Sequence, residues 1–151
     1  MAFNTAEAVE AFWQARQRGE FAATEYYDRL HIDDAHKIQL GLIDRRIALG
    51  ERQIGWKVGL TAKAIQQQFG FHEPVFGCVL ETVPSGHMFP AGSLINPGFE
   101  CELCMRLGRD LVPGADLAAA RAAVAEIYPA LEIIETRVPM TQIPCAMADN
   151  A

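Results

Sequence analysis

The sequence lacks any apolar run long enough to cross a bilayer, for which a helix needs about 20 consecutive apolar residues. It also lacks clusters of lysine and arginine, and its formal net charge is -6. Because proteins that bind nucleic acids or anionic membranes usually do so through clustered positive charge, we expect neither as a partner. The start of the chain has neither the basic residues nor the apolar core of a secretory signal, so we expect a cytoplasmic protein.

The four cysteines do not have the spacings typical of disulfide-rich scaffolds, and thiols in the cytoplasm are normally reduced. Cys101 and Cys104 form a C-x-x-C motif. On a strand, however, residues three apart face opposite sides, and no second cysteine pair completes a zinc site. We therefore do not expect zinc.

The composition, 50% hydrophobic and 21% charged over 151 residues, is typical of one globular domain. Capping signals, apolar periodicity and turn residues predict an α+β fold, with a helical region over 1–53 and a strand-bearing region over 54–151. The expected elements are helices from Asn4 toward Gly19 and from Asp33 to Gly50, a strand at 54–60, a helix at 62–69, a loop at 70–77, strands near 78–80 and 93–95, a strand through Glu100, a turn at 112–114, a helix at 117–128 and a strand at 130–134. No closing element is evident in 144–151.

Two carboxylates, Glu100 and Glu102, interrupt an apolar run and would share one face of a strand. Their side chains can converge on one point only if a cation or a proton neutralises them. The plain alternative is a half-exposed strand with a charged outer face. Glu132, in a second apolar run, would add a third carboxylate, and such oxygen-rich sets suit Mg²⁺ or Mn²⁺.

One lysine, Lys57, lies between two glycines in the predicted strand at 54–60. An ammonium group is costly in an apolar stretch unless an anion is near, so Lys57 could balance the carboxylates or pair with an anionic substrate. Its plain alternative is a lysine that reaches the surface. Glu135 and Arg137 have a plain alternative as well, a structural ion pair.

The residues resemble the 2-keto-4-pentenoate hydratases and 4-oxalocrotonate decarboxylases of the fumarylacetoacetate hydrolase superfamily. Five motifs carry the resemblance in order, from about Ile32 onward. They are Gly55-Trp56-Lys57-Val58-Gly59-Leu60-Thr61, His72-Glu73-Pro74-Val75-Phe76-Gly77, Glu100-Cys101-Glu102, Pro129-Ala130-Leu131-Glu132-Ile133-Ile134-Glu135-Thr136-Arg137 and Ala148-Asp149-Asn150-Ala151. The approach to the lysine motif, Ala48-Leu49-Gly50-Glu51-Arg52, also looks like the hydratases.

The resemblance implies part of a mixed β-sandwich or barrel of that superfamily. It implies a metal-dependent hydratase acting on 2-hydroxypenta-2,4-dienoate or a close homologue in aromatic-compound breakdown. The residues it implies are Glu100, Glu102 and Glu132 as ligands of Mg²⁺ or Mn²⁺, Lys57 and Glu73 as catalytic groups, and Thr61 and Asp149 as substrate contacts. For His72 and Glu73 the alternative is a lid role, and for Asp149 and Asn150 a plain turn.

Relatives of this kind continue with a long C-terminal segment that is missing here. We therefore expect a truncated product, or strands supplied by another subunit, and in either case unpaired sheet edges that favour a homo-oligomer or aggregation. Decarboxylation of 4-oxalocrotonate is an alternative activity, because it shares every motif. A non-catalytic fragment or partner subunit is the third hypothesis.

Overall fold

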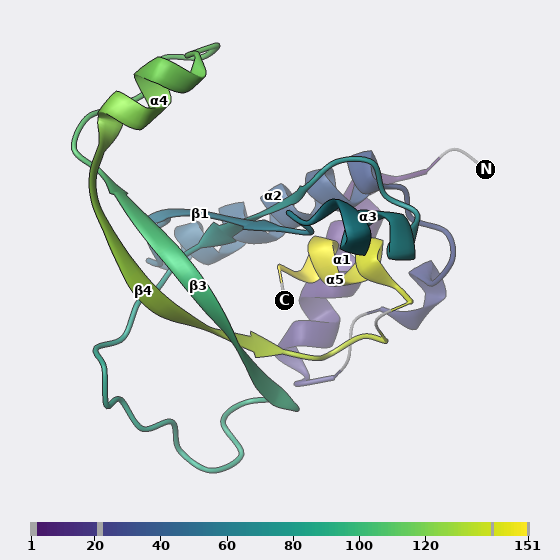
Figure 1. Cartoon of the computed structure of the whole chain (residues 1–151). Coiled ribbons are helices and arrows are strands. Elements are labelled where there is room, and N and C mark those ends of the chain that lie inside the picture. The colour runs from purple at the N-terminus through teal and green to yellow at the C-terminus, as the bar shows by residue number, and fades with distance from the viewer. Residues whose placement is uncertain (1–2, 21–22, 140, 151) are drawn as a thin grey trace. The chain divides into compact units, whose positions relative to one another are not determined.

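The computed structural model describes residues 3–20, 23–139 and 141–150. Contacts divide the chain into two compact units, one formed by Met1–Asn96 with Thr136–Ala151 and the other by Pro97–Glu135. Figure 1 shows the elements of both. The predicted boundary between residues 53 and 54 separates helical from strand-bearing sequence and stays a prediction.

Two long helices open the first unit, α1 (Thr5–Gln17) and α2 (Ile32–Ala48), with the short 3-10 helix η1 (Thr24–Tyr26) between them. Both helices were predicted. The side chain of Asn4 accepts hydrogen bonds from the backbone N–H groups of Ala6 and Glu7, which confirms Asn4 as the N-cap. Asp33 and Asp34 lie in the first turn of α2, where the helix dipole favours negative charge.

The core of this unit forms where α1 and α5 (Ile143–Asp149) pack against α2. Phe12, Ile38 and Cys145 are almost completely buried there. The buried amide of Gln39 donates hydrogen bonds to the carbonyl oxygens of Phe76 and Met147, so it ties α2 both to α5 and to the strand that holds Phe76. Both donors of a buried amide are thus satisfied.

A two-stranded antiparallel sheet completes the first unit, with β1 (Gly55–Gly59) paired to β2 (Val75–Val79). The helix α3 (Lys63–Phe69) connects the strands and ends at Gly70, whose positive φ of 74° suits glycine. The strand at β1 and the helix at α3 are confirmed. β2, however, begins at Val75, inside the stretch predicted as loop, because it pairs along the whole length of β1.

The second unit is a long antiparallel ribbon of β3 (Pro97–Leu107) and β4 (Val124–Glu135), with α4 (Leu117–Ala123) at one end. The register is regular except for an irregularity between Arg106 and Leu107. The predicted strand through Glu100 is confirmed, and the predicted strand at 130–134 is the second half of β4.

Three further predicted features are wrong. No strand forms at 93–95, where the chain bends before β3. The helix predicted to reach Tyr128 ends at Ala123, because pairing with β3 draws Ile127 and Tyr128 into β4 against the helical tendency of the alanines. The end of the chain does have a closing element, α5, with a proline in its first turn and Asn150 as a left-handed cap. Ala151 lies outside the described residues.

Within the described ranges, no helix is both long and apolar enough to span a membrane.

Candidate metal centre and lysine strand

Three glutamates meet on one face of the β3–β4 ribbon. Glu100 lies directly opposite Glu132 in the register, and Glu102 lies opposite Ala130. Residues two apart on a strand share a face, and directly opposite residues have Cβ atoms about 4.5–5.5 Å apart. One carboxylate oxygen from each of Glu100, Glu102 and Glu132 lies within 4.8 Å of the other two. Of the described residues, this is the only group of three or more acidic, histidine or cysteine side chains that could hold a metal ion.

The spacing of the three oxygens fits a hard divalent cation. Oxygen ligands lie about 2.0–2.1 Å from Mg²⁺ and 2.3–2.6 Å from Ca²⁺, so two ligands on opposite sides of the ion are about 4–5 Å apart. The three oxygens all lie within 4.8 Å of one another, so they are close enough to contact one such ion together. Like charges placed directly opposite on a sheet are destabilising, and a cation between them removes that cost. The donor set therefore suits the predicted ion.

The lysine strand belongs to the first unit. Lys57 is half-buried in β1, opposite Gly77 in β2. Burial raises the pKa of the neighbouring Cys78 thiol, and the positive charge of Lys57 opposes that rise. Lys57 is therefore neither a core residue nor a fully solvated one.

Of the other predicted site residues, Thr61 and Glu73 are exposed, Thr61 just after β1 and Glu73 in the bend before β2. His72 is exposed in the same bend. These three side chains are therefore accessible to a ligand that arrives from solvent.

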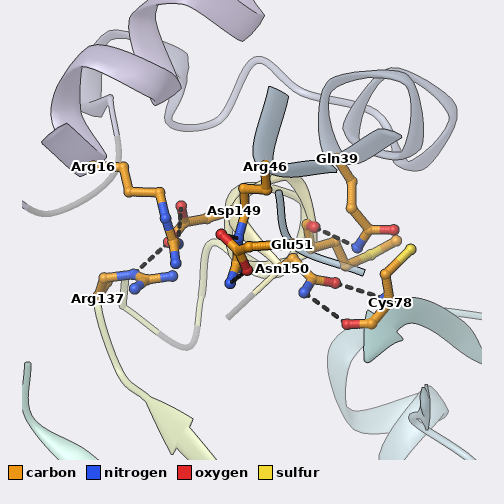
Figure 2. Close-up of polar contacts among 9 residues, drawn as sticks. Arg16, Gln39, Arg46, Glu51, Cys78, Arg137, Asp149 and Asn150 are labelled. Atoms are coloured by element: carbon orange, nitrogen blue, oxygen red, sulfur yellow. Dashed lines mark hydrogen bonds and ion pairs between the residues drawn. The ribbon is translucent and has the colours of Figure 1, made fainter. Parts of the chain in front are cut away.

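Asp149 has a different setting, because its carboxylate is buried among arginines. Its Oδ2 accepts a hydrogen bond of 2.5 Å from Nε of Arg137, and its Oδ1 lies 3.9 Å from Nη1 of Arg16 (Figure 2). The side chains of Asp149 and Arg137 are only 4% and 8% exposed. Asp149 thus forms a buried ion pair with Arg137, and its predicted substrate contact stays a prediction.

The predicted residues therefore fall into two sets. The cluster Glu100, Glu102 and Glu132 lies within the second unit. The first unit holds the others, which are Lys57, Thr61, Glu73 and Asp149.

Comparison with known proteins gives the same assignment as the motifs. No family model matches the chain. A 2-hydroxypent-2,4-dienoate hydratase of Pseudomonas putida is 37% identical over 81% of this chain and 58% of its own length. A 2-keto-4-pentenoate hydratase of Paraburkholderia xenovorans (strain LB400) is 36% identical over 96% of this chain and 56% of its own. A solved 4-oxalocrotonate decarboxylase from Pseudomonas putida G7, complexed with magnesium and adipate, is 26% identical, with a TM-score of 0.84 over 97% of this chain and 58% of that one.

The chain is related to the 2-keto-4-pentenoate hydratases and the 4-oxalocrotonate decarboxylases. The resemblance drawn from the motifs is thereby confirmed, and so is the expected mixture of helices and strands. The chain spans a little more than half the length of the curated hydratases that it matches, 58% and 56% in the two comparisons above.

Sequence reasoning missed three residues that shape the lysine strand and its surroundings. They are Gly77, which appeared only as the end of a loop motif, the half-buried Arg16 beside Asp149, and the buried Gln39. The strand register identifies Gly77 as the partner of Lys57, and no local sequence signal carries that information. For Gln39, a polar residue within the apolar stripe of α2 was the available signal.

Proposed function

We propose that this protein is a metal-dependent hydratase that adds water to 2-hydroxypenta-2,4-dienoate (2-keto-4-pentenoate) or a close homologue in aromatic-compound breakdown. The observation that carries the proposal is the cluster of Glu100, Glu102 and Glu132 in a chain 36–37% identical to hydratases. A hydratase of this substrate must stabilise negative charge on the C2 oxygen and deliver a proton to the conjugated chain.

The three glutamates would hold Mg²⁺ or Mn²⁺. Magnesium and calcium in the solved decarboxylase complexes support a divalent ion. Bound there, the cation would supply positive charge to the substrate carboxylate and C2 oxygen. Three carboxylates around a dication leave about one negative charge, so an ammonium group suits the remaining charge of the complex.

Lys57 is our proposed proton-transfer group, and Glu73 a second acid or base. Lysine serves in this way when its surroundings hold the ammonium in place, and the half-burial of Lys57 supports the choice. The exposure of Glu73 and of Thr61 supports contact with a ligand that arrives from solvent. For Asp149 we propose an indirect effect on the substrate. Its ion pair with Arg137 fixes the position of the backbone at this residue.

Decarboxylation of 4-oxalocrotonate is the second candidate. It is favoured by the similarity to solved 4-oxalocrotonate decarboxylases, with TM-scores of 0.84 and 0.83. Both reactions need the same stabilised enolate, so the same cluster serves either. A non-catalytic fragment or partner subunit is a third candidate, supported only by the partial coverage of the relatives.

Product identification separates the candidates. Purified protein with Mg²⁺ is mixed with the dienol substrate and, in a separate sample, with 4-oxalocrotonate; absorbance decay is followed in each, and the products are identified by mass spectrometry. Hydration adds one water to the substrate, whereas decarboxylation of 4-oxalocrotonate releases CO₂. A protein that binds metal but turns over neither substrate would support the third candidate and contradict the first.

We further propose that the complete fold is a mixed β-sandwich or barrel and that the protein forms a homo-oligomer. The face of the ribbon opposite the glutamates supports this, because it is apolar and largely exposed. We call this face the apolar ladder; it comprises Phe99, Cys101, Leu103, Met105 and Leu107 of β3 and Val124, Ile127, Pro129, Leu131 and Ile133 of β4. A two-stranded ribbon is marginally stable alone, so this face needs a cover.

An aspartate in the apolar ladder should weaken self-association. Leu103 and Leu131 are 69% and 64% exposed. Leu103→Asp should raise the dissociation constant of the oligomer by about tenfold or more, because it replaces a central apolar contact with a buried charge. Sedimentation velocity over a concentration series measures it. Val112→Asp is the matched control, since Val112 is 73% exposed but lies outside the ladder. A wild-type protein that sediments as a monomer at all concentrations would contradict the proposal.

A further inference from the structure

The side chain of Lys57 lies across Gly77. These residues are register partners in the β1–β2 sheet. A Cβ atom added to Gly77 would lie 2.6 Å from Cε of Lys57 and 2.9 Å from its Cγ, which is closer than Cβ contacts in real proteins. Gly77 is buried, and its φ is not in the left-handed region, so its backbone does not require glycine. The space that a Cβ would need is instead occupied by neighbouring side chains, of which the lysine side chain comes nearest.

The side-chain amide of Asn150 lies at the same place. Its Oδ1 would be 2.9 Å from the added Cβ on Gly77. This amide is held on both sides, because Oδ1 accepts a hydrogen bond of 2.7 Å from the N–H of Cys78 and Nδ2 donates one of 2.9 Å to the carbonyl oxygen of Cys78 (Figure 2). Asn150 thus pairs with β2 as a neighbouring strand residue would.

The position of Asn150 is itself fixed by the fold. It caps α5 in the left-handed conformation, with φ 54°, and the adjacent Asp149 is anchored by Arg137. A carbonyl oxygen of an amide has two lone pairs, and a fixed amide oxygen is a favourable neighbour for an ammonium group. The C-terminal end of α5 therefore presents a rigid polar group beside the stem of Lys57.

We propose that Gly77 and Asn150 are positioning residues for Lys57. Because Gly77 has no side chain, the aliphatic part of Lys57 can pass over β2 at this position. The amide oxygen of Asn150 borders the same space, and its hydrogen bond from the backbone N–H of Cys78 fixes its orientation. The ammonium group is thereby held in one region instead of sampling the rotamers of an exposed lysine. The catalytic part of this inference rests on the proposed function, whereas the geometric part does not.

Trace labelling of lysines tests the geometry without requiring activity. The chain has three lysines, so acetic anhydride labelling followed by peptide mass spectrometry can compare Lys57 with the exposed Lys63 in each protein. In Gly77→Ala the new methyl group should displace the lysine stem, and labelling of Lys57 relative to Lys63 should rise several-fold. Gly55→Ala is the matched control, because a Cβ there meets nothing nearer than 4.0 Å.

A second variant keeps the inference testable if Gly77→Ala does not fold. Asn150→Gly retains a residue that adopts positive φ readily and removes only the amide, and it should also raise the labelling ratio. Wild-type ratios in folded samples of both variants would overturn the inference. Circular dichroism melts establish that each sample is folded.

Turnover separates the inference from the proposed function. If the wild type is an active hydratase, Gly77→Ala should lower kcat by about tenfold or more with little change in KM, because a small misplacement of a catalytic group slows chemistry. If Gly77→Ala raises the labelling ratio but keeps the wild-type kcat, the positioning inference stands and Lys57 is not a catalytic residue. If the wild type shows no turnover, the labelling ratio still confirms or overturns the positioning.

Discussion

An Asp149→Asn variant is expected to lose about 3–5 kcal/mol of the free energy of unfolding, because it removes the carboxylate charge from a buried ion pair with the guanidinium of Arg137. The pair is buried on both sides, at 4% and 8% side-chain exposure, and Arg16 adds a second positive charge at 3.9 Å. Such a loss is a large part of the stability of a domain this size. Urea denaturation followed by circular dichroism measures it.

The matched control is Glu20→Gln, which removes an acidic partner of an exposed ion pair in the same unit. Arg18 and Glu20 are 53% and 56% exposed, so the change should cost no more than about 1 kcal/mol. Replacing both buried partners with apolar residues, as in Arg137→Met with Asp149→Leu, should restore most of the loss. If Asp149→Asn has the same urea midpoint of unfolding as the wild type but binds substrate poorly, Asp149 contributes to ligand binding and not to stability.

The shared face of Glu100 and Glu102 could be predicted from the sequence, because side chains two apart on a strand always point the same way. The position of Glu132 directly opposite Glu100 could not be predicted in this way, because it depends on the register of two strands about 30 residues apart. Glu132 stood out only as a carboxylate within an apolar run, and the motif resemblance implied the same residue as a ligand. The structure then brings all three oxygens within 4.8 Å.

Local propensity failed where a distant partner decides the conformation. The alanine-rich stretch after Leu117 favours helix by itself, yet the chain becomes strand at Val124 because β3 offers hydrogen bonds and cross-strand contacts. The same reason explains Asp149. Its neighbours along the chain suggest a turn, whereas its partners Arg137 and Arg16 are 12 and 133 residues away, and only the folded chain brings them together.

Mg²⁺ is expected to raise the melting temperature of the wild-type protein, and Glu102→Gln is expected to abolish that rise. An ion that binds only the folded state stabilises it by about 2.7 kcal/mol at 100 times its dissociation constant. Glutamine keeps the size of the side chain but loses the charge, and the remaining glutamates do not make the same oxygen-rich site. Melting curves over a series of Mg²⁺ concentrations, at constant ionic strength set with NaCl, measure the effect.

The response without metal separates a ligand from a residue that merely supports the ribbon. Three carboxylates within 4.8 Å repel one another, so Glu102→Gln in EDTA should melt at the wild-type temperature or above it. The matched control is Glu126→Gln, on β4 of the same ribbon, where the glutamate is paired to Arg106 and the Mg²⁺ response should persist. A full Mg²⁺ response in Glu102→Gln would exclude Glu102 as a ligand. A lower melting temperature in EDTA would show that the carboxylate stabilises the ribbon by itself, and the cluster would then need no cation to explain it.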